Sequence, residues 1–133
     1  MKNQVLSIEQ MQRLKDLGID TSKASVIRVS VFSDYPDFEM LGASKGYTKS
    51  AIKKFGRFTL QDILEILPSE ICDDYNGTYY LKAVKNSMGF WRYMYAFATD
   101  VINNNCHAKP NIEAAYETLV WCAENGYLKG DAQ

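Results

Sequence analysis

Few side chains in this sequence can exchange protons or bind a metal ion near neutral pH. The chain has one histidine, His107, and three widely spaced cysteines, Cys72, Cys106 and Cys122. Neighbouring side chains on an extended backbone point apart, so the adjacent pair Cys106-His107 does not indicate a nucleophile–base dyad. A structural zinc site needs four Cys or His ligands in close-spaced pairs, and there is no CxxC. We therefore predict no catalytic residue, no metal and no cofactor.

The other candidates for chemistry are weak too. Asp34 with Asp37, and the pair Asp73-Asp74, bring carboxylates close in the sequence, but solvated loop acids explain both pairs. The glycine spacing matches neither nucleotide-binding fingerprint, so no phosphate loop is expected. We therefore predict that the protein is not an enzyme, and we compare two classes of binding protein below.

One segment of the chain is basic, and its residue types favour a ligand. No acid lies between Met40 and Gln61, and this part of the chain contains five cations: Lys45, Lys49, Lys53, Lys54 and Arg57. Tyr47, Phe55 and Phe58 are interleaved with them. Cations that meet phosphates, beside aromatic rings that stack on bases, are typical of nucleic-acid binding. A solvated surface loop is the competing interpretation.

Three segments have the caps and the apolar spacing of helices. The expected helices, each with its N-cap, are 7–17 (Ser7), 59–67 (Thr59) and 112–125 (Asn111). Gln10 and Asp62 complete capping boxes in the first two, and Gly18 and Pro68 mark where these two end. The stretch 48–55 is long enough for two further turns of helix.

The strands are expected at 26–32, where apolar and polar residues alternate, and in an aromatic hairpin over 78–99. A three-residue loop, 87–89, puts Gly89 in the left-handed conformation and sets Asn86 opposite Phe90. This register keeps Lys82 and Arg92 together on one face. A two-residue loop is the alternative, and it mixes these charges with the aromatic residues.

One face of this hairpin is expected to stay open. The helices cover the aromatic face, and the opposite face then exposes more apolar area than scattered surface residues would. The predicted interface consists of Tyr80, Val84, Phe90, Arg92 and Met94, with Lys82 and Ala96 on the same face. A second copy of the chain is the simplest cover for an open face or an unpaired strand edge. We therefore predict a homodimer, with a different protein as the alternative partner.

Length and composition place these elements in one domain. The chain has 133 residues, of which 47% are hydrophobic, and a net charge of −1. We predict a single α+β domain over 1–133, with an antiparallel sheet of about three strands around the central hairpin and three helices mainly on one face. No apolar run has the length that a signal peptide or a membrane span needs, and three scattered cysteines form no disulfide framework. We therefore expect a cytoplasmic protein with free cysteines and no membrane partner.

Three segments together resemble a known group of proteins. They are LSIEQMQRLKDLGIDTSKAS (6–25), FTLQDILEILPSEI (58–71) and AAYETLVWCAENGYL (114–128). The group consists of small uncharacterised proteins of gut Bacteroides-type bacteria, often found in prophage or other mobile-element regions. The resemblance implies a cytoplasmic α+β protein of bacterial or phage origin. It implies no activity, cofactor or catalytic residue.

Two functional hypotheses follow from the sequence. The leading one is a small non-enzymatic protein–protein interaction or accessory protein of bacterial or phage origin. The alternative is a nucleic-acid-binding accessory protein that uses the basic segment 45–57. The net charge of −1 gives the whole chain no general attraction to nucleic acid, so the alternative depends on local clustering of the cations.

Overall fold

The computed structural model describes residues 5–29, 40–73 and 77–128, and the described chain contains four helices and two antiparallel sheets. In chain order the elements are α1 (Ile8–Asp16), β1 (Val26–Val29), β2 (Met40–Ala43), α2 (Lys49–Phe55), β3 (Gly56–Arg57), α3 (Leu60–Ile66), β4 (Glu70–Asp73), β5 (Gly77–Lys85), β6 (Trp91–Phe97), β7 (Asp100–Val101) and α4 (Asn111–Glu124).

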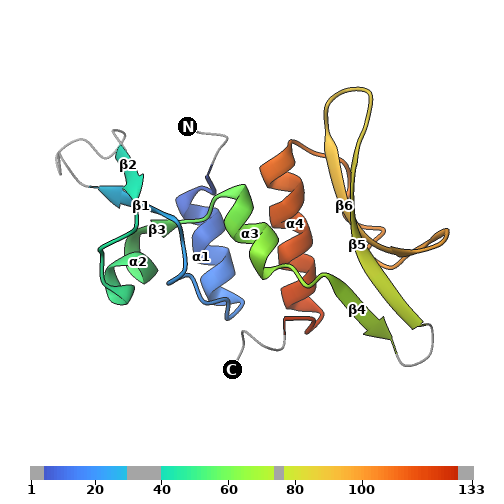
Figure 1. Ribbon diagram of the computed structural model, residues 1–133, viewed down its shortest axis with the longest axis horizontal. Helices are drawn as coiled ribbons and strands as arrows, with labels where there is room; N and C mark the ends of the chain where they lie inside the picture. The colour runs from blue at the N-terminus through green and yellow to red at the C-terminus, as the bar shows by residue number, and fades with distance from the viewer. Residues whose placement is uncertain (1–4, 30–39, 74–76, 129–133) are drawn as a thin grey trace.

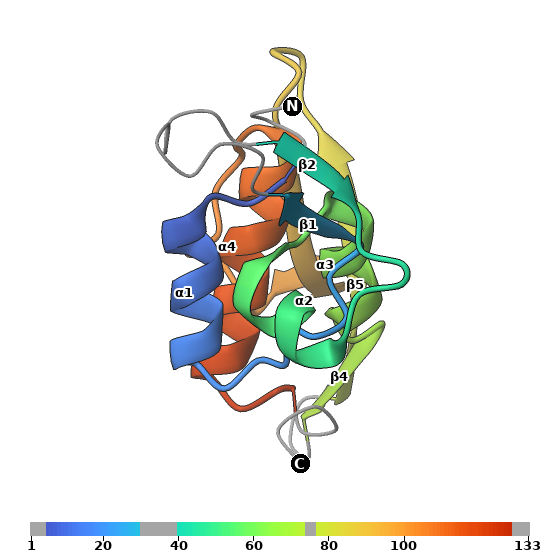
Figure 2. The same cartoon turned by 90° about the vertical axis from the view of Figure 1, so that its left-hand side faces the viewer.

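The two sheets lie at opposite ends of the molecule. One has three strands in the order β2-β1-β3, and the other has four in the order β4-β5-β6-β7. The helices α1, α3 and α4 lie between them, with α4 against the four-stranded sheet, and α2 lies beside the three-stranded sheet (Figure 1). Viewed from the three-stranded end, β1, β2 and α2 stand in front of α1 and α4 (Figure 2).

The prediction of an α+β fold is confirmed, but the prediction of a single sheet of about three strands is wrong, because there are two sheets. The additional strands are two to four residues long, and such short pieces show no period-2 pattern in the sequence. The predicted strand 26–32 is observed as β1 over its first four residues, and its remainder lies outside the described residues.

The predicted helix starts and stops are mostly confirmed. Ser7 and Thr59 cap α1 and α3 with complete capping boxes. Gly18 has a φ of +86°, and Ile19 N–H donates to Leu14 O at 3.0 Å, which closes the Schellman turn after α1. The residues 49–55 form α2, with Thr48 as its cap.

The predicted N-cap of α4 is wrong. Asn111 is the first residue of the helix, and its side chain makes no cap hydrogen bond. Instead its Oδ1 accepts a hydrogen bond from Tyr93 Oη at 2.6 Å. The buried hydroxyl of Tyr93 needs a hydrogen-bond acceptor. Because Asn111 supplies this acceptor, its side chain does not form the helix cap that asparagine locally favours.

The hairpin of β5 and β6 has the predicted register. Asn86 N–H donates to Phe90 O at 2.8 Å, and Gly89 has a φ of +85° in the three-residue loop. Ala83 lies opposite Tyr93, and the aromatic face meets α4. The rings of Tyr93 and Tyr95 are buried in a core shared with the helices.

The opposite face of the hairpin is only partly open, which corrects the prediction. Tyr80, Val84 and Phe90 are exposed, but Ala96 is buried, and Met94 and Arg92 are half-buried. The chain between β7 and α4 follows the outer edge of β6, where Ile102 and Lys109 form backbone hydrogen bonds with Tyr95 and Trp91 (Figure 1). Arg92 Nε donates to a backbone carbonyl of this segment, Cys106 O, at 2.8 Å.

Asn103 in the same segment completes the edge of β6. Its carboxamide accepts from Tyr95 N–H at 2.8 Å and donates to Tyr93 O at 2.9 Å, as a peptide group of a further strand would. The side chain has no exposed surface. On either side, the backbone of β6 is paired by Lys109 and by Ile102. Asn103 therefore fills the interval where no strand reaches the sheet edge.

We predict that Asn103→Ala lowers the free energy of unfolding by about 1–3 kcal/mol. The buried N–H of Tyr95 loses its partner and Tyr93 O keeps only the Thr118 hydroxyl, and an unsatisfied buried group costs roughly 1–3 kcal/mol. Urea denaturation of both proteins measures the difference. The matched control is Asn104→Ala, because Asn104 is exposed in the same asparagine run. Equal stability of the two variants would contradict the role given to Asn103.

Candidate anion-binding site

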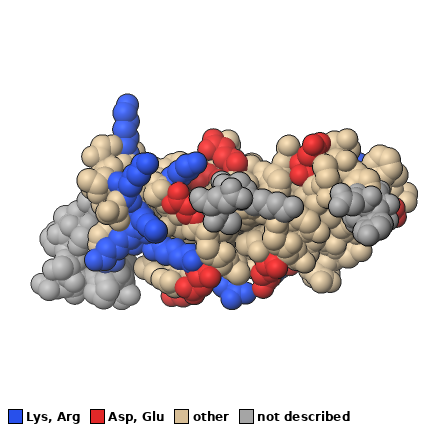
Figure 3. Space-filling view, turned by 90° about the horizontal axis from the view of Figure 1, so that it is seen from below, with Lys and Arg blue, Asp and Glu red and all other residues tan. Residues whose placement is uncertain are grey.

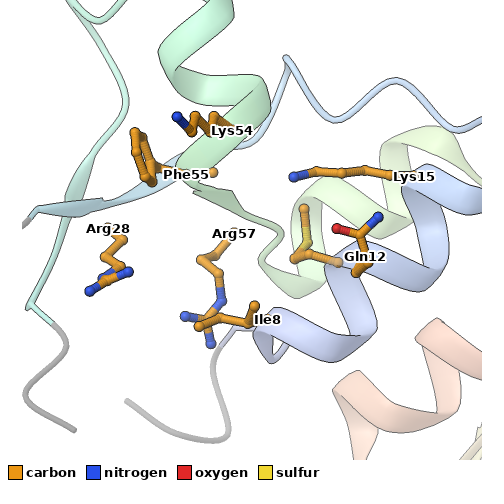
Figure 4. Close-up of a pocket in the computed structure, with 9 residues that line it drawn as sticks. Ile8, Gln12, Lys15, Arg28, Lys54, Phe55 and Arg57 are labelled. Atoms are coloured by element: carbon orange, nitrogen blue, oxygen red, sulfur yellow. The ribbon is translucent and has the colours of Figure 1, made fainter. Parts of the chain in front are cut away.

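A basic pocket lies between α1 and the three-stranded sheet. Four cations from four different elements line it: Lys15 of α1, Arg28 of β1, Lys54 of α2 and Arg57 of β3. Its volume is about 220 Å³, and Gln12 is the one uncharged polar side chain among the described residues that line it. The side chains of Lys15 and Lys54 approach the opening from two sides, and the two guanidinium groups lie at a third side (Figure 4). None of these described lining residues is acidic.

The close approach of α2 to β1 and β3 fixes one wall of the pocket. Gly56 directly follows α2, and a Cβ built on it would lie 2.3 Å from Ile52 O and 2.8 Å from the Cβ of Ala24. Its backbone conformation, with φ −69° and ψ 149°, is open to any residue. Glycine is therefore required here for lack of space, and this contact holds Lys54 and Arg57 on the same pocket.

A buried carboxylate positions the start of β1. Asp62 in the first turn of α3 accepts hydrogen bonds from Ser25 N–H at 2.9 Å and Thr59 N–H at 3.0 Å, and also from the Ser25 hydroxyl. The side chain is 5% exposed. It therefore caps its own helix and also anchors the residue before β1, the strand that holds Arg28.

Arg57 is the most buried of the four cations. Its Nε donates a hydrogen bond to Leu6 O, and the residue is 8% exposed. Burial lowers the pKa of its guanidinium, nearby Glu9 raises it, and nearby Arg28 lowers it. Arginine nevertheless stays charged at neutral pH. Two guanidinium groups are thus held close enough to repel each other, an arrangement that an anion would stabilise.

The predicted basic segment is divided by the fold. Lys54 and Arg57 line the pocket, whereas Lys45, Lys49 and Lys53 are exposed and lie outside its lining. Lys53 instead lies near Asp20, whose pKa is lowered mainly by hydrogen bonds from Ser22 and to a smaller extent by the charges of Lys53 and Lys23. Lys49 and Lys54 are only five positions apart in α2, so neighbouring cations in a sequence need not serve one site.

The sequence reasoning missed Lys15 and Arg28. Both precede the basic segment by more than fifteen residues, so no local cluster of cations in the sequence marks them. Of the three aromatic residues considered with the segment, Phe55 and Tyr47 are exposed, at 42% and 47%. Phe58 has no exposed surface, so its predicted availability for stacking is wrong.

The cysteines and the histidine are not assembled into a site in the described structure. Cys72, Cys106 and Cys122 are free thiols, as predicted. Burial raises the pKa of the Cys122 thiol to about 12 and also raises that of Cys106, so both stay protonated at neutral pH. His107 is exposed. Among the residues described, no three His, Cys, Asp or Glu side chains come together as metal ligands would.

The comparisons with known proteins identify no relative. No family model matches the chain, and no curated protein or solved structure is significantly similar to it. The resemblance to small bacterial proteins therefore stays a prediction. None of the described helices has both the length and the apolar character needed to cross a membrane.

We predict that Gly56→Ala destabilises the protein by about 1–3 kcal/mol, because the added methyl group overpacks the contact between α2 and β1. Thermal and urea denaturation measure the effect. Ser50→Ala is the control, since Ser50 is exposed on the same helix. A Gly56→Ala protein as stable as the control would show that α2 can move away without cost.

Proposed function

We propose that this chain binds the phosphate backbone of nucleic acid through the end that carries the three-stranded sheet. The single observation behind the proposal is the pocket whose four cations come from four elements and whose described lining residues include no acid. Seen from below, Lys and Arg side chains gather toward this end, whereas Asp and Glu are distributed over the rest of that face (Figure 3). The described part of this face is thus locally positive, although the net charge of the chain is −1.

Exposed aromatic rings beside these cations favour a single strand over a duplex. Phe55 lies on the pocket, with Lys54 Nζ 5.4 Å from its ring centroid, and Tyr47 precedes α2. Unpaired bases can stack on such rings, and stacking is tolerant of sequence. The proposal therefore names single-stranded nucleic acid, with the outer lysines Lys45, Lys49 and Lys53 as additional phosphate contacts.

We predict a steep salt dependence of oligonucleotide binding, measured by fluorescence anisotropy over a series of salt concentrations. Each neutralised phosphate contributes about 0.7 to the slope of log K against log salt for a single strand. Arg28→Ala should weaken binding and reduce the slope by about that amount. Lys82→Ala removes an exposed cation from the hairpin at the other end and should change neither quantity. Equal effects of the two substitutions would exclude the pocket as the binding site.

A second candidate function, protein–protein interaction, is supported by the hairpin. Tyr80 and Val84 are each 48% exposed on one face of β5, and Phe90 on the same face is 38% exposed. Leu81 N–H donates to Ser69 O at 3.0 Å, but within the described chain no strand pairs the outer edge of β5 beyond this point. Edge pairing of β5 with a second copy would cover both features.

We predict that Ala83→Pro returns such a homodimer to a monomer. Leu81 points its N–H away from β6, and Ala83, two residues further, does the same, so proline removes only the donor offered to a partner. Light scattering at high protein concentration measures the mass, and Ser50→Ala, an exposed position on α2 far from the hairpin, is the control. Val84→Asp tests the apolar face, because Val84 is exposed. A change at Met94 would also disturb packing, because Met94 is half-buried. A monomeric wild-type protein would remove the dimer.

A further inference from the structure

We propose that the basic pocket receives the terminal phosphate of a nucleic-acid strand, a phosphomonoester, and this inference rests on the proposed nucleic-acid binding. The pocket concentrates four cations around about 220 Å³. An internal phosphodiester has one negative charge, whereas a phosphomonoester has nearly two at neutral pH and three strong acceptor oxygens. Four convergent cations therefore match the terminal group better than a link within the strand.

The kinds of cation in the pocket fit the same group. Arg28 and Arg57 offer planar guanidinium donors, which suit phosphate oxygens, and Lys15 and Lys54 add two mobile point charges. Among described residues, neither Arg28 nor Lys15 forms an ion pair, so both charges are available to a ligand. The guanidinium groups of Arg28 and Arg57 lie near each other on one side of the opening (Figure 4).

The lining is also partly apolar, and this distinguishes the pocket from a solvated basic surface. Ile8, Met11 and Phe55 contribute to it, and Phe55 remains 42% exposed. Apolar walls lower the local dielectric and strengthen contacts between phosphate and cations. With a terminal phosphate held inside, the first base would reach the Phe55 ring and stack there. The rest of the strand would leave toward the exposed lysines of α2.

The test compares three otherwise identical labelled oligonucleotides: one with a 5′-phosphate, one with a 3′-phosphate and one with both ends hydroxylated. Fluorescence anisotropy at constant salt should show one phosphorylated strand binding about tenfold more tightly than the hydroxylated strand, as expected for one further charge-assisted group. The preference should shrink when the pH is lowered below about 6, where the phosphomonoester loses its second charge. Binding of the hydroxylated strand should change less.

Variants distinguish binding in the pocket from general attraction to a basic surface. Arg28→Ala and Lys15→Ala should abolish the preference for the phosphorylated strand, whereas Lys53→Ala, on α2 but outside the lining, should retain it. Glu9→Gln removes the acid near Arg57 and should increase the preference. Circular dichroism confirms that each variant is folded.

Three outcomes would overturn the inference. Equal affinity for all three strands would exclude terminal recognition and leave the proposed function standing. Absence of binding to every strand at low salt would exclude both. Tighter binding of a phosphoserine peptide than of the phosphorylated strand, lost in Arg28→Ala, would assign the pocket to a protein ligand.

Discussion

The fold depends on how the backbone of β6 satisfies its outward-facing hydrogen-bonding groups. A buried sheet edge without partners would cost several kcal/mol. Asn103 supplies a carboxamide in place of a strand, and Thr118 of α4 donates its hydroxyl to the same Tyr93 carbonyl at 3.2 Å. The two tyrosine hydroxyls then extend the connection, because Tyr95 Oη donates to Pro68 O at 2.7 Å and Tyr93 Oη to Asn111 Oδ1 at 2.6 Å. One strand thereby fixes the end of α3 and the start of α4.

The basic pocket depends on this central part through α3. Asp62 at the start of that helix anchors Ser25, and thus the strand that holds Arg28. On the other side, the ion pair of Arg13 with Glu124, at 3.0 Å, joins α1 to α4 at the surface, where such pairs contribute little to stability. The pocket is therefore built on rigid elements, and its cations are placed by a capped helix and a close glycine contact.

Local signals predicted the local structure, and tertiary contacts account for what the sequence did not predict. The capping boxes at Ser7 and Thr59 and the turn at Gly89 are complete within a few residues, so their sequence patterns were sufficient. The strands β3 and β7 have two residues each and exist only because a neighbouring strand pairs with them. Asn103 and Asn111 are indistinguishable from turn and cap residues until their partners on β6 are known. Lys15 and Arg28 likewise join Lys54 and Arg57 only after the chain has folded.

The placement of the two sheets at opposite ends has a consequence for assembly. A strand held at the basic pocket leaves the hairpin uncovered, so both ends can be occupied at once (Figure 1). If two copies pair along β5, their basic ends point outward at the extremities of an elongated particle. Such a particle is bivalent. A polymer bound at one site experiences a high effective concentration of the second site only if it is long enough to span the particle. Length of the bound polymer, rather than its sequence, would then determine avidity.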